Sequence, residues 1–410
     1  MRIKILCLLL LANILQANSL KELIKIANKN NLVVESKKLL TQSKMKELES
    51  SKSSLLPTLD IGGFYQRLDD RTPMIAGDIY SGYAKISYNI YDGKRTSSTI
   101  KQKQNELKAT TFEFKSFQKN LSLQIVQDFY MIKNISSTIK ALKEKQIALK
   151  AQLDRVKKFY EAEISTKEDI DKIQSAYDTN VYMIESLNFK KLSKLKVLEL
   201  KVGKPITILN DTKFQKKEIL DFRIDDNIKA LEYKMNSLKN IASSISSVNL
   251  PQINISDTYN VYDYKRDDIT HPKGIPNQNK LLLSVNLRVF DGGFTSENEQ
   301  AMLIKAKSLN SQILQVKKEQ KIMFDLAKSR IKTVKANIKS TLSALKSSNS
   351  TYETIQKKYK AGVVDNISYL DALSVKTDAF SLYEKSLNDL EVAYAIYYFY
   401  AGRNIEEFIK

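Results

Sequence analysis

The sequence has almost none of the residues that build metal sites, disulfides or thiol chemistry. Its 410 residues include one cysteine, Cys7, one histidine, His271, and no tryptophan. Cys7 lies in an apolar run near the N-terminus, and His271 lies in a stretch rich in proline, glycine and asparagine. Disulfides need cysteine pairs, and zinc sites need several nitrogen, sulfur or carboxylate ligands together. We therefore expect no disulfide, no metal site and no cofactor.

Catalytic motifs are missing as well. The sequence has no glycine-rich phosphate loop and no nucleophile elbow. Asp169 and Asp171 are close in sequence, but residues i and i+2 of a helix point about 200° apart, so they form no catalytic pair. We predict that the protein is not an enzyme.

The net charge is +20, yet only ten of the 66 basic residues are arginine. Nucleic-acid sites favour the planar guanidinium group of arginine, and the lysines here are spread along the chain. Solvated helix faces explain this composition better, so we expect no nucleic-acid partner.

The first residues have the features of a secretory signal peptide. Basic residues precede an apolar run from Ile5 to Leu15, and Ala17 offers a cleavage point. Such a segment is too short for a membrane anchor, and no other run reaches the roughly 20 apolar residues of a spanning helix. We expect residues 1–17 to be removed and the chain to be exported.

Helix breakers are absent from two long stretches. Neither glycine nor proline occurs between Gly93 and Gly203 or between Gly293 and Gly362. Apolar residues recur there at steps of three, four and seven, which is typical of helices that pack along their length. The predicted helices are long hairpins at 95–202 and 294–401 and shorter helices at about 20–54 and 226–247.

Four other segments alternate apolar and polar residues. In the last of them, Leu281, Leu283 and Val285 alternate with polar neighbours. Segments of about ten residues with this period match tilted membrane-spanning strands, although a sheet on a soluble core has the same pattern. The export signal and the lack of another apolar element to cover these faces favour the membrane. The predicted strands span about 56–68, 80–91, 252–264 and 280–290.

Residues 51–206 recur, recognisably, as residues 245–405. Pro57 corresponds to Pro251 and Asp92 to Asp291. A tandem repeat of this length indicates two copies of one large supersecondary unit. We expect a first repeat at 18–206, an inter-repeat segment at 207–225 and a second repeat at 226–410.

Four strands cannot close a barrel around a lumen, and open sheet edges in lipid would leave backbone groups unpaired at several kilocalories per mole each. The strands of one copy must therefore pair with those of others. A cyclic dimer would have eight strands and an interior filled by side chains, whereas a trimer would have twelve and room for water. We expect a homotrimer whose strands lie in lipid.

Several motifs recur in a fixed order along the chain. The segments at 91–95 and 290–294 read YDGKR and FDGGF, and the segment at 359–374 reads YKAGVVDNISYLDALS. This order resembles the TolC family of outer-membrane efflux and secretion channels. The segments are similar to the family's strand-to-helix turns and to the tip that joins its helices. The resemblance covers about 390 residues.

This resemblance implies a mixed α/β membrane protein. Its homotrimer would form a twelve-stranded outer-membrane barrel, continuous with a helical barrel in the periplasm. It implies a passive duct of a tripartite efflux or type I secretion system, which works with a periplasmic adaptor and an inner-membrane pump. The alternative is an exported coiled-coil adaptor or adhesin without a pore, which leaves the four strands unexplained.

The resemblance also implies a periplasmic gate. The family has two aspartates, three residues apart, at the positions of Ser368 and Asp371, so this chain retains one of them. A trimer would turn it into a ring of three carboxylates, which favours cations. Asp365 is a candidate substitute for the missing acid, the alternative being that it only starts the next helix. In the first repeat, Asp169 holds the position equivalent to Ser368.

Two further groups of residues complete the expected site. The hairpin tips are our candidates for adaptor docking, and the strand-to-helix turns are expected to be structural because glycine permits the dihedral angles and aspartate caps the next helix. The tip residues are Tyr160, Ala162, Glu163, Tyr359, Ala361 and Gly362, and the turn residues are Asp92, Gly93, Asp291 and Gly292.

Overall fold

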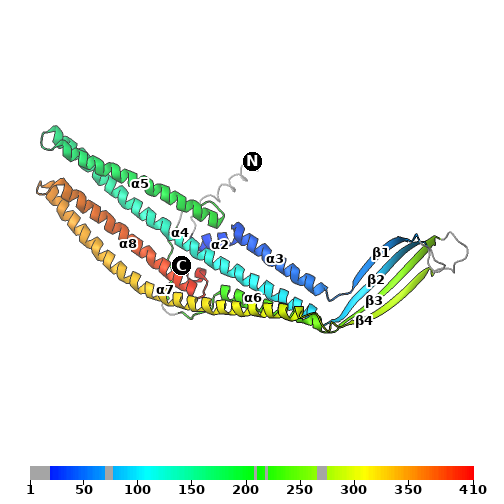
Figure 1. Ribbon diagram of the computed structural model, residues 1–410. Helices are drawn as coiled ribbons and strands as arrows, with labels where there is room; N and C mark the ends of the chain where they lie inside the picture. The colour runs from blue at the N-terminus through cyan, green and yellow to red at the C-terminus, as the bar shows by residue number, and fades with distance from the viewer. Residues whose placement is uncertain (1–18, 70–76, 207–209, 218–219, 266–274) are drawn as a thin grey trace, which may run out of the picture. The chain divides into compact units, whose positions relative to one another are not determined.

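The computed structural model describes residues 19–69, 77–206, 210–217, 220–265 and 275–410. The predicted signal peptide at 1–17 and His271 lie outside the described residues. The chain is mostly helical with one small antiparallel sheet, which confirms the mixed class (Figure 1). The elements are α2 (Leu20–Asn30), α3 (Leu32–Ser53), β1 (Thr58–Arg67), β2 (Asp78–Asp92), α4 (Arg95–Glu161), α5 (Lys167–Val202), α6 (Asp226–Ser246), η1 (Ser247–Asn249), β3 (Gln252–Lys265), β4 (Asn277–Asn286), α7 (Phe294–Lys360), α8 (Asn366–Tyr400) and η2 (Ile405–Phe408).

The residues form two compact units. The first comprises the described residues up to Lys38 together with Phe114–Asp226 and Val316–Lys410, and the second comprises Leu39–Glu113 and Asn227–Gln315. Helices α3, α4 and α7 contribute residues to both. None of the helices in the described part of the chain is long and apolar enough to cross a membrane.

The sheet lies in the second unit and has the strand order β1-β2-β3-β4, every neighbouring pair being antiparallel (Figure 1). The register places Leu59 opposite Ile86, Ile86 opposite Asp257, and Asp257 opposite Leu281. Because side chains alternate across a strand, these residues share one face of the sheet. Lys85, which pairs with Asp60 and Thr258, lies on the other face.

Strand β4 ends at Asn286, whereas the alternating pattern extends to residue 290. The reason is its neighbour: Asn286 pairs with Gln252, the first residue of β3, and Pro251 before it has no backbone N–H to donate. Residues 287–290 therefore continue past the partner strand, and Val289 and Phe290 are 87% and 85% exposed.

The predicted helix at 20–54 is two helices, α2 and α3, separated by Asn31. The Asn31 side-chain oxygen accepts hydrogen bonds from the backbone N–H groups of Val33 and Val34 at 2.9 and 3.0 Å, and its amide donates to the carbonyl of Lys201 at 2.8 Å. Asparagine is favoured at the N-cap of a helix, because its side-chain oxygen accepts hydrogen bonds from the first backbone N–H groups. The interruption is thus a helix cap buried against α5.

The first unit has a large aromatic core around the end of α8. Phe214 and Ile409 form an isolated antiparallel bridge, which ties the inter-repeat segment to the C-terminal residues. The buried Glu391 accepts the Phe214 N–H at 2.7 Å, and burial raises the pKa of Tyr398 to about 12, so its hydroxyl stays a donor to the carbonyl of Gln215. The core includes Leu20, Ile24, Ile125, Phe129, Tyr130, Tyr394, Tyr397 and Phe408.

Candidate functional site

The two long hairpins reverse direction through the same backbone motif. At the end of α4, the N–H of Ile164 donates to the carbonyl of Phe159 at 2.8 Å, and at the end of α7 the N–H of Val363 donates to Lys358 at 2.9 Å. These are the long hydrogen bonds of a Schellman cap, which needs one residue in the left-handed region. That residue is Glu163 in the first hairpin (φ 57°) and Gly362 in the second (φ 74°).

Three polar side chains link the two hairpins near these tips, and we call them the tip network: Gln152, Tyr359 and Asn366. The Gln152 amide on α4 donates to the Tyr359 hydroxyl on α7, which donates to the side-chain oxygen of Asn366 on α8. Gln152 also lies 3.3 Å from the Asn366 oxygen. The network connects α4 with both helices of the second hairpin.

Aromatic and apolar contacts surround the tip network. The Arg155 guanidinium lies 5.0 Å from the centroid of the Phe159 ring and 5.2 Å from that of Tyr359, which stacks on Tyr369 at 5.0 Å. Burial raises the pKa of Tyr359, so its hydroxyl remains neutral. Beneath it lies a cluster shared by α4, α7 and α8: Leu149, Tyr352, Tyr369, Ala372 and Leu373.

Two of the predicted gate acids act as helix caps. Asp169 forms a capping box with Thr166 at the start of α5, and Asp365 accepts the Ser368 N–H at 2.9 Å at the start of α8. Burial alone would raise the pKa of Asp169, but hydrogen bonds from Thr166, Ser165 and Asn366 lower it. The pKa of Asp365 is lowered mainly by the Ser368 N–H.

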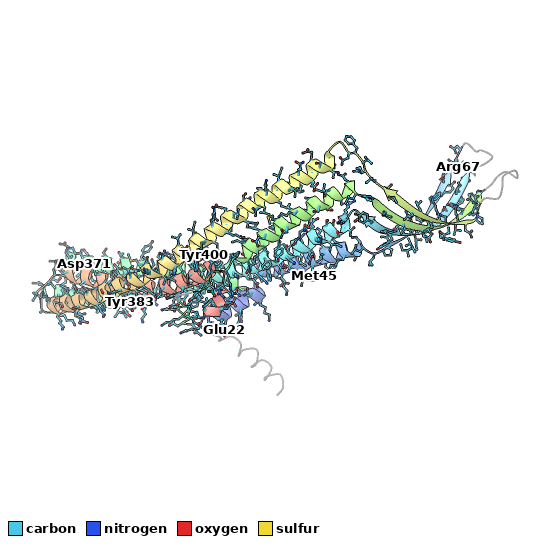
Figure 2. All side chains as sticks on the ribbon, turned by 90° about the horizontal axis from the view of Figure 1, so that it is seen from below. Glu22, Met45, Arg67, Asp371, Tyr383 and Tyr400 are labelled. Carbon is cyan, nitrogen blue, oxygen red and sulfur yellow. The ribbon has the colours of Figure 1, made fainter. Side chains whose placement is uncertain are left out.

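Asp371 differs from these two acids. It is exposed in the second turn of α8, where Figure 2 labels it. Among the residues that the structure describes, its carboxylate has no hydrogen-bond or ion-pair partner. Ser368 contributes its backbone N–H, which donates a hydrogen bond to the Asp365 carboxylate at the start of α8. Of the four predicted gate positions, Asp371 is thus the one whose charge is free to act on solvent or ions.

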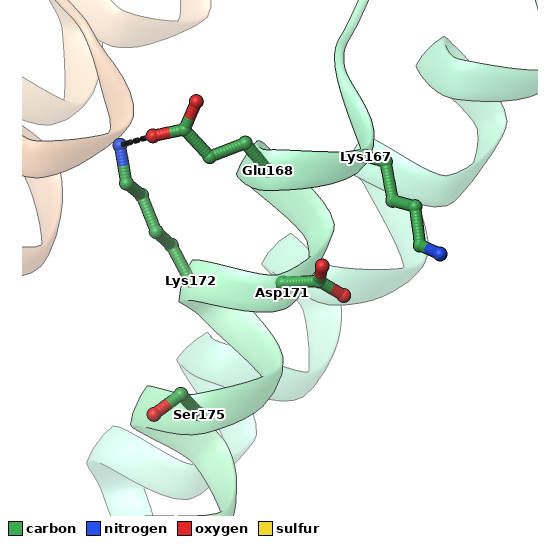
Figure 3. Close-up of a pocket in the computed structure, with 5 residues that line it drawn as sticks. All are labelled: Lys167, Glu168, Asp171, Lys172 and Ser175. Carbon is green, nitrogen blue, oxygen red and sulfur yellow. Dashed lines mark ion pairs between the residues drawn. The ribbon is translucent and has the colours of Figure 1, made fainter.

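A surface depression lies along the first turns of α5, as Figure 3 shows. Glu168 and Lys172 form an ion pair at 2.6 Å, and Lys167 and Asp171 point to the other side. All its lining residues come from α5, and no other element among the described residues supplies a second wall. Within the described ranges, no group of three or more His, Cys, Asp or Glu side chains could hold a metal ion.

The strand-to-helix turns have one geometry in both halves. The Asp92 carboxylate accepts the Thr96 N–H at 2.7 Å, and Asp291 accepts the Thr295 N–H at 3.1 Å. The glycines that follow each aspartate have positive φ angles of 67° and 68°. These side chains satisfy the first N–H groups of α4 and α7.

Sequence reasoning missed Gln152, Asn366 and Lys145, whose contacts join α4 to the second hairpin. Nothing in the local pattern marks them, because their partners lie more than 200 residues away. The caps are readable from the sequence, since Thr166 and Asp169 have the spacing of a capping box and a helix start is the alternative interpretation of Asp365.

The sequence matches no protein-family model and no curated protein. Solved structures match the fold over nearly the whole chain. A membrane protein from Pseudomonas aeruginosa superimposes with a TM-score of 0.83 over 93% of each chain at 14% identity. The CmeC outer membrane channel of Campylobacter jejuni gives 0.81 over 95% of this chain and 86% of that chain at 16% identity.

The outer membrane protein VceC of Vibrio cholerae gives a TM-score of 0.81 over 94% of this chain and 96% of that chain, at 11% identity. Sequence identities this low establish a common fold and nothing finer. The resemblance drawn from the sequence motifs is therefore confirmed at the level of the fold. This chain has the fold of the TolC-like outer-membrane channels.

Proposed function

We propose that the chain is the outer-membrane channel of a tripartite efflux or type I secretion system. Three copies form a passive duct across the outer membrane and the periplasm. The sheet carries this proposal: one of its faces has a belt of apolar side chains, and the outer edges of β1 and β4 have no partner strand in the described part of the chain. Two similar structures support it: one is described as an outer membrane protein and the other as an outer membrane channel.

The apolar belt runs diagonally across the strands. On β1 it extends from Leu59 to Tyr65, which lies opposite Tyr80 near the loop end of the sheet. On β4 it begins at Leu281, level with Leu59, and continues the other way toward the helices through Val289. A belt parallel to a membrane crosses tilted strands in this way, and closed barrels require tilted strands. The diagonal shift favours a tilted barrel wall.

The two free edges support closure with other copies. Each edge has a row of backbone groups that lipid cannot satisfy, so β4 of one copy should pair with β1 of the next. Three copies supply twelve strands, which leave a water-filled lumen. The same closure would bring three sets of long hairpins together around one axis in the periplasm.

Internal duplication fits this assembly. Helices α4 and α7 each contain 67 residues, and α5 and α8 contain 36 and 35. We assign the first repeat to 18–206, the second to 226–410 and the segment between them to an equatorial region. At 1.5 Å per residue, α4 is about 100 Å long. The hairpin tips at 160–163 and 359–362 would dock the periplasmic adaptor, which links the duct to an inner-membrane pump.

An adhesin or adaptor without a pore is not favoured. Such a protein has no need of a sheet whose apolar face is exposed: Ile61, Leu281 and Leu283 are 81%, 70% and 61% exposed. Apolar faces of this size mark a surface that another molecule covers. Lipid covers it in the proposed arrangement.

The test of this function is reconstitution of the full-length protein. Membranes from expressing cells should yield a heat-modifiable trimer in the outer-membrane fraction, and the purified trimer should form stable pores in planar bilayers. Recovery in the soluble periplasmic fraction, or trimers that never conduct, would reject the duct. A monomer in mild detergent would reject barrel closure by three copies.

Asp257 offers a test of which sheet face meets lipid. It lies in the middle of the apolar belt, level with Leu59, Ile86 and Leu281, and no partner for its carboxylate occurs among the described residues. A charge at this depth costs about 1–3 kcal/mol. Asp257→Val is therefore expected to raise the thermal midpoint of the reconstituted trimer by several degrees.

The control for Asp257 is Asp60→Val on the opposite face, where Asp60 pairs across the strands with Lys85. This change removes an opposite-charge pair and should give no gain in stability. Thermal melts of both variants in the same lipid would show which face of the sheet contacts lipid. A gain for Asp60→Val and a loss for Asp257→Val would reverse the assignment of the two faces.

The gate proposal predicts a specific effect of Asp371→Ala. Three carboxylates at one level attract cations and bind divalent ones. Their removal should weaken block by Mg²⁺ severalfold and raise single-channel conductance, measured in planar bilayers. Asp365→Asn is the matched control, because that acid caps α8 and should leave block unchanged. Equal block in wild type and Asp371→Ala would remove Asp371 from the gate.

A further inference from the structure

One lysine lies on a buried helix face near the gate. Lys145 follows Leu142 by three residues on α4 and precedes Leu149 by four, and both leucines are buried. Residues at these spacings share one face of a helix. Lys145 is itself half-buried, and its Nζ atom donates a hydrogen bond to the Ser374 hydroxyl on α8 at 2.6 Å.

The partner of Lys145 lies between two aspartates. On α8, Asp371, Ser374 and Asp378 follow each other at steps of three and four, so all three lie on one face, about one turn apart. Both aspartates are exposed, and neither has a hydrogen-bond or ion-pair partner in the described ranges. A face with two unpaired acids thus has an ammonium group anchored at its midpoint.

The charges are close enough to interact. Burial lowers the pKa of Lys145, and the charge of Asp378 raises it. The lysine therefore lies within the electrostatic field of this carboxylate. The Ser374 hydroxyl holds the ammonium group on the side of α8 that presents Asp371.

We propose that Lys145 is a selectivity-determining residue, whose ammonium group compensates the carboxylates of Asp371 and Asp378 at the constriction of the duct. This inference rests on the proposed function. In the trimer, three lysines from α4 would stand between two rings of three aspartates from α8. The constriction would then have a mixed ring of charge, and its preference for cations would be weaker than two acidic rings alone would produce.

The ammonium group serves two purposes that substitutions can separate. As a charge it sets the local potential, and as a donor it joins α4 to α8 through Ser374. Lys145→Met removes both, whereas Lys145→Gln keeps a donor without the charge. If compensation of charge is the role, the two variants must change selectivity alike.

The experiment is a reversal-potential measurement on the reconstituted trimer in a KCl gradient, with Mg²⁺ block as a second readout. Lys145→Met and Lys145→Gln should each raise the K⁺ to Cl⁻ permeability ratio about threefold or more, because the ring loses three positive charges. Adding Asp378→Asn to either variant should return the ratio toward the wild-type value. Lys143→Met, on an exposed position of the same helix, should change neither quantity.

Several outcomes would overturn the inference. An unchanged permeability ratio in both Lys145 variants would exclude a role in selectivity. A change in Lys145→Met alone would show that the hydrogen bond, and not the charge, matters. The same change in Lys143→Met would indicate a diffuse effect of net charge. A wild-type trimer that forms no pore would instead reject the proposed function itself, and this result is seen before any variant is compared.

Discussion

Gly402→Ala is expected to destabilise the protein by several kilocalories per mole. Gly402 lies just after α8 with a φ angle of 74°, and a Cβ atom there would come 2.3 Å from the backbone oxygen of Arg223. The left-handed conformation alone costs an alanine about 1–2 kcal/mol. The contact adds to this, because the N–H of Arg223 is bonded to the carbonyl of Ala401 at 3.0 Å and the two segments cannot separate freely.

Gly292→Ala is the matched control for this prediction. Gly292 has a φ angle of 68°, yet a Cβ atom there would meet nothing within 4 Å. The Gly292→Ala variant should be destabilised only by the cost of the left-handed conformation. Its thermal midpoint should therefore fall much less than that of Gly402→Ala. Melting curves followed by circular dichroism in one detergent would compare them. Equal losses would show that the approach of Arg223 to Gly402 contributes nothing to stability.

The stability of this region depends on how tightly it holds the inter-repeat segment. Phe214 and Tyr398 contact each other in the core with ring centroids 6.1 Å apart, and Phe408 stacks on Tyr398 at 4.0 Å. Backbone hydrogen bonds join residues 213 and 215 to the C-terminal segment. Displacement at Gly402 would therefore disturb the aromatic packing around Tyr398.

The helices were the most predictable part of the fold. Their ends coincide with the few glycines and prolines: Gly203, whose φ angle is 73°, caps the end of α5, and α4 begins two residues after Gly93. Breakers act locally, so a single sequence contains the information. The break at Asn31 was missed because asparagine is tolerated inside helices, and only the packing against Lys201 favours its use as a cap.

Strand positions were predictable where alternation and pairing agree. They differ at β4, where Leu287 and Val289 keep the apolar alternation but β3 has already begun at Gln252. The alternation of side chains shows which face of the sheet a residue occupies, but it does not show where the neighbouring strand ends. The length of paired strand depends on that neighbour, and here β3 begins only after Pro251.

The candidate site was less predictable, for a physical reason. Asp371 could be found because a known motif places it near the tip. Gln152 and Lys145 could not, since their roles depend on how α4 is rotated against α8, and apolar periodicity fixes that rotation only within a broad stripe. Polar residues at the edge of such a stripe can reach solvent or a neighbouring helix, and sequence alone does not distinguish these cases.

Tyr359→Phe is expected to shift the tips of the hairpins toward an open arrangement. The variant keeps the ring contacts with Tyr369 and Arg155 but loses the hydroxyl that joins Gln152 on α4 to Asn366 on α8. Gln152 is buried, and its amide would keep only the 3.3 Å contact with the Asn366 oxygen, so the lost hydrogen bond costs about 0.5–1.5 kcal/mol. Each 1.4 kcal/mol is a factor of about ten in an equilibrium, and three copies would add their effects.

The measurement is a recording of single channels. It gives the mean conductance and the fraction of time that a channel spends in its higher-conductance level. Both should rise in Tyr359→Phe, and the thermal midpoint should fall only slightly because the aromatic packing remains. Gln152→Leu, which removes the other side of the same hydrogen bond, should act in the same direction. Conductance that matches wild type in both variants would show that the tip network does not hold the duct shut.

The equivalent residue of the first repeat supplies the decisive control. Tyr160 corresponds to Tyr359, but it is 46% exposed and its hydroxyl has no partner among the described residues. The repeat explains why: the positions equivalent to Gln152 and Asn366 are Thr351 and Lys167. Tyr160→Phe should therefore leave conductance unchanged. A difference between two tyrosines at matching positions would show that the repeats share a backbone turn and differ in the side chains that close it.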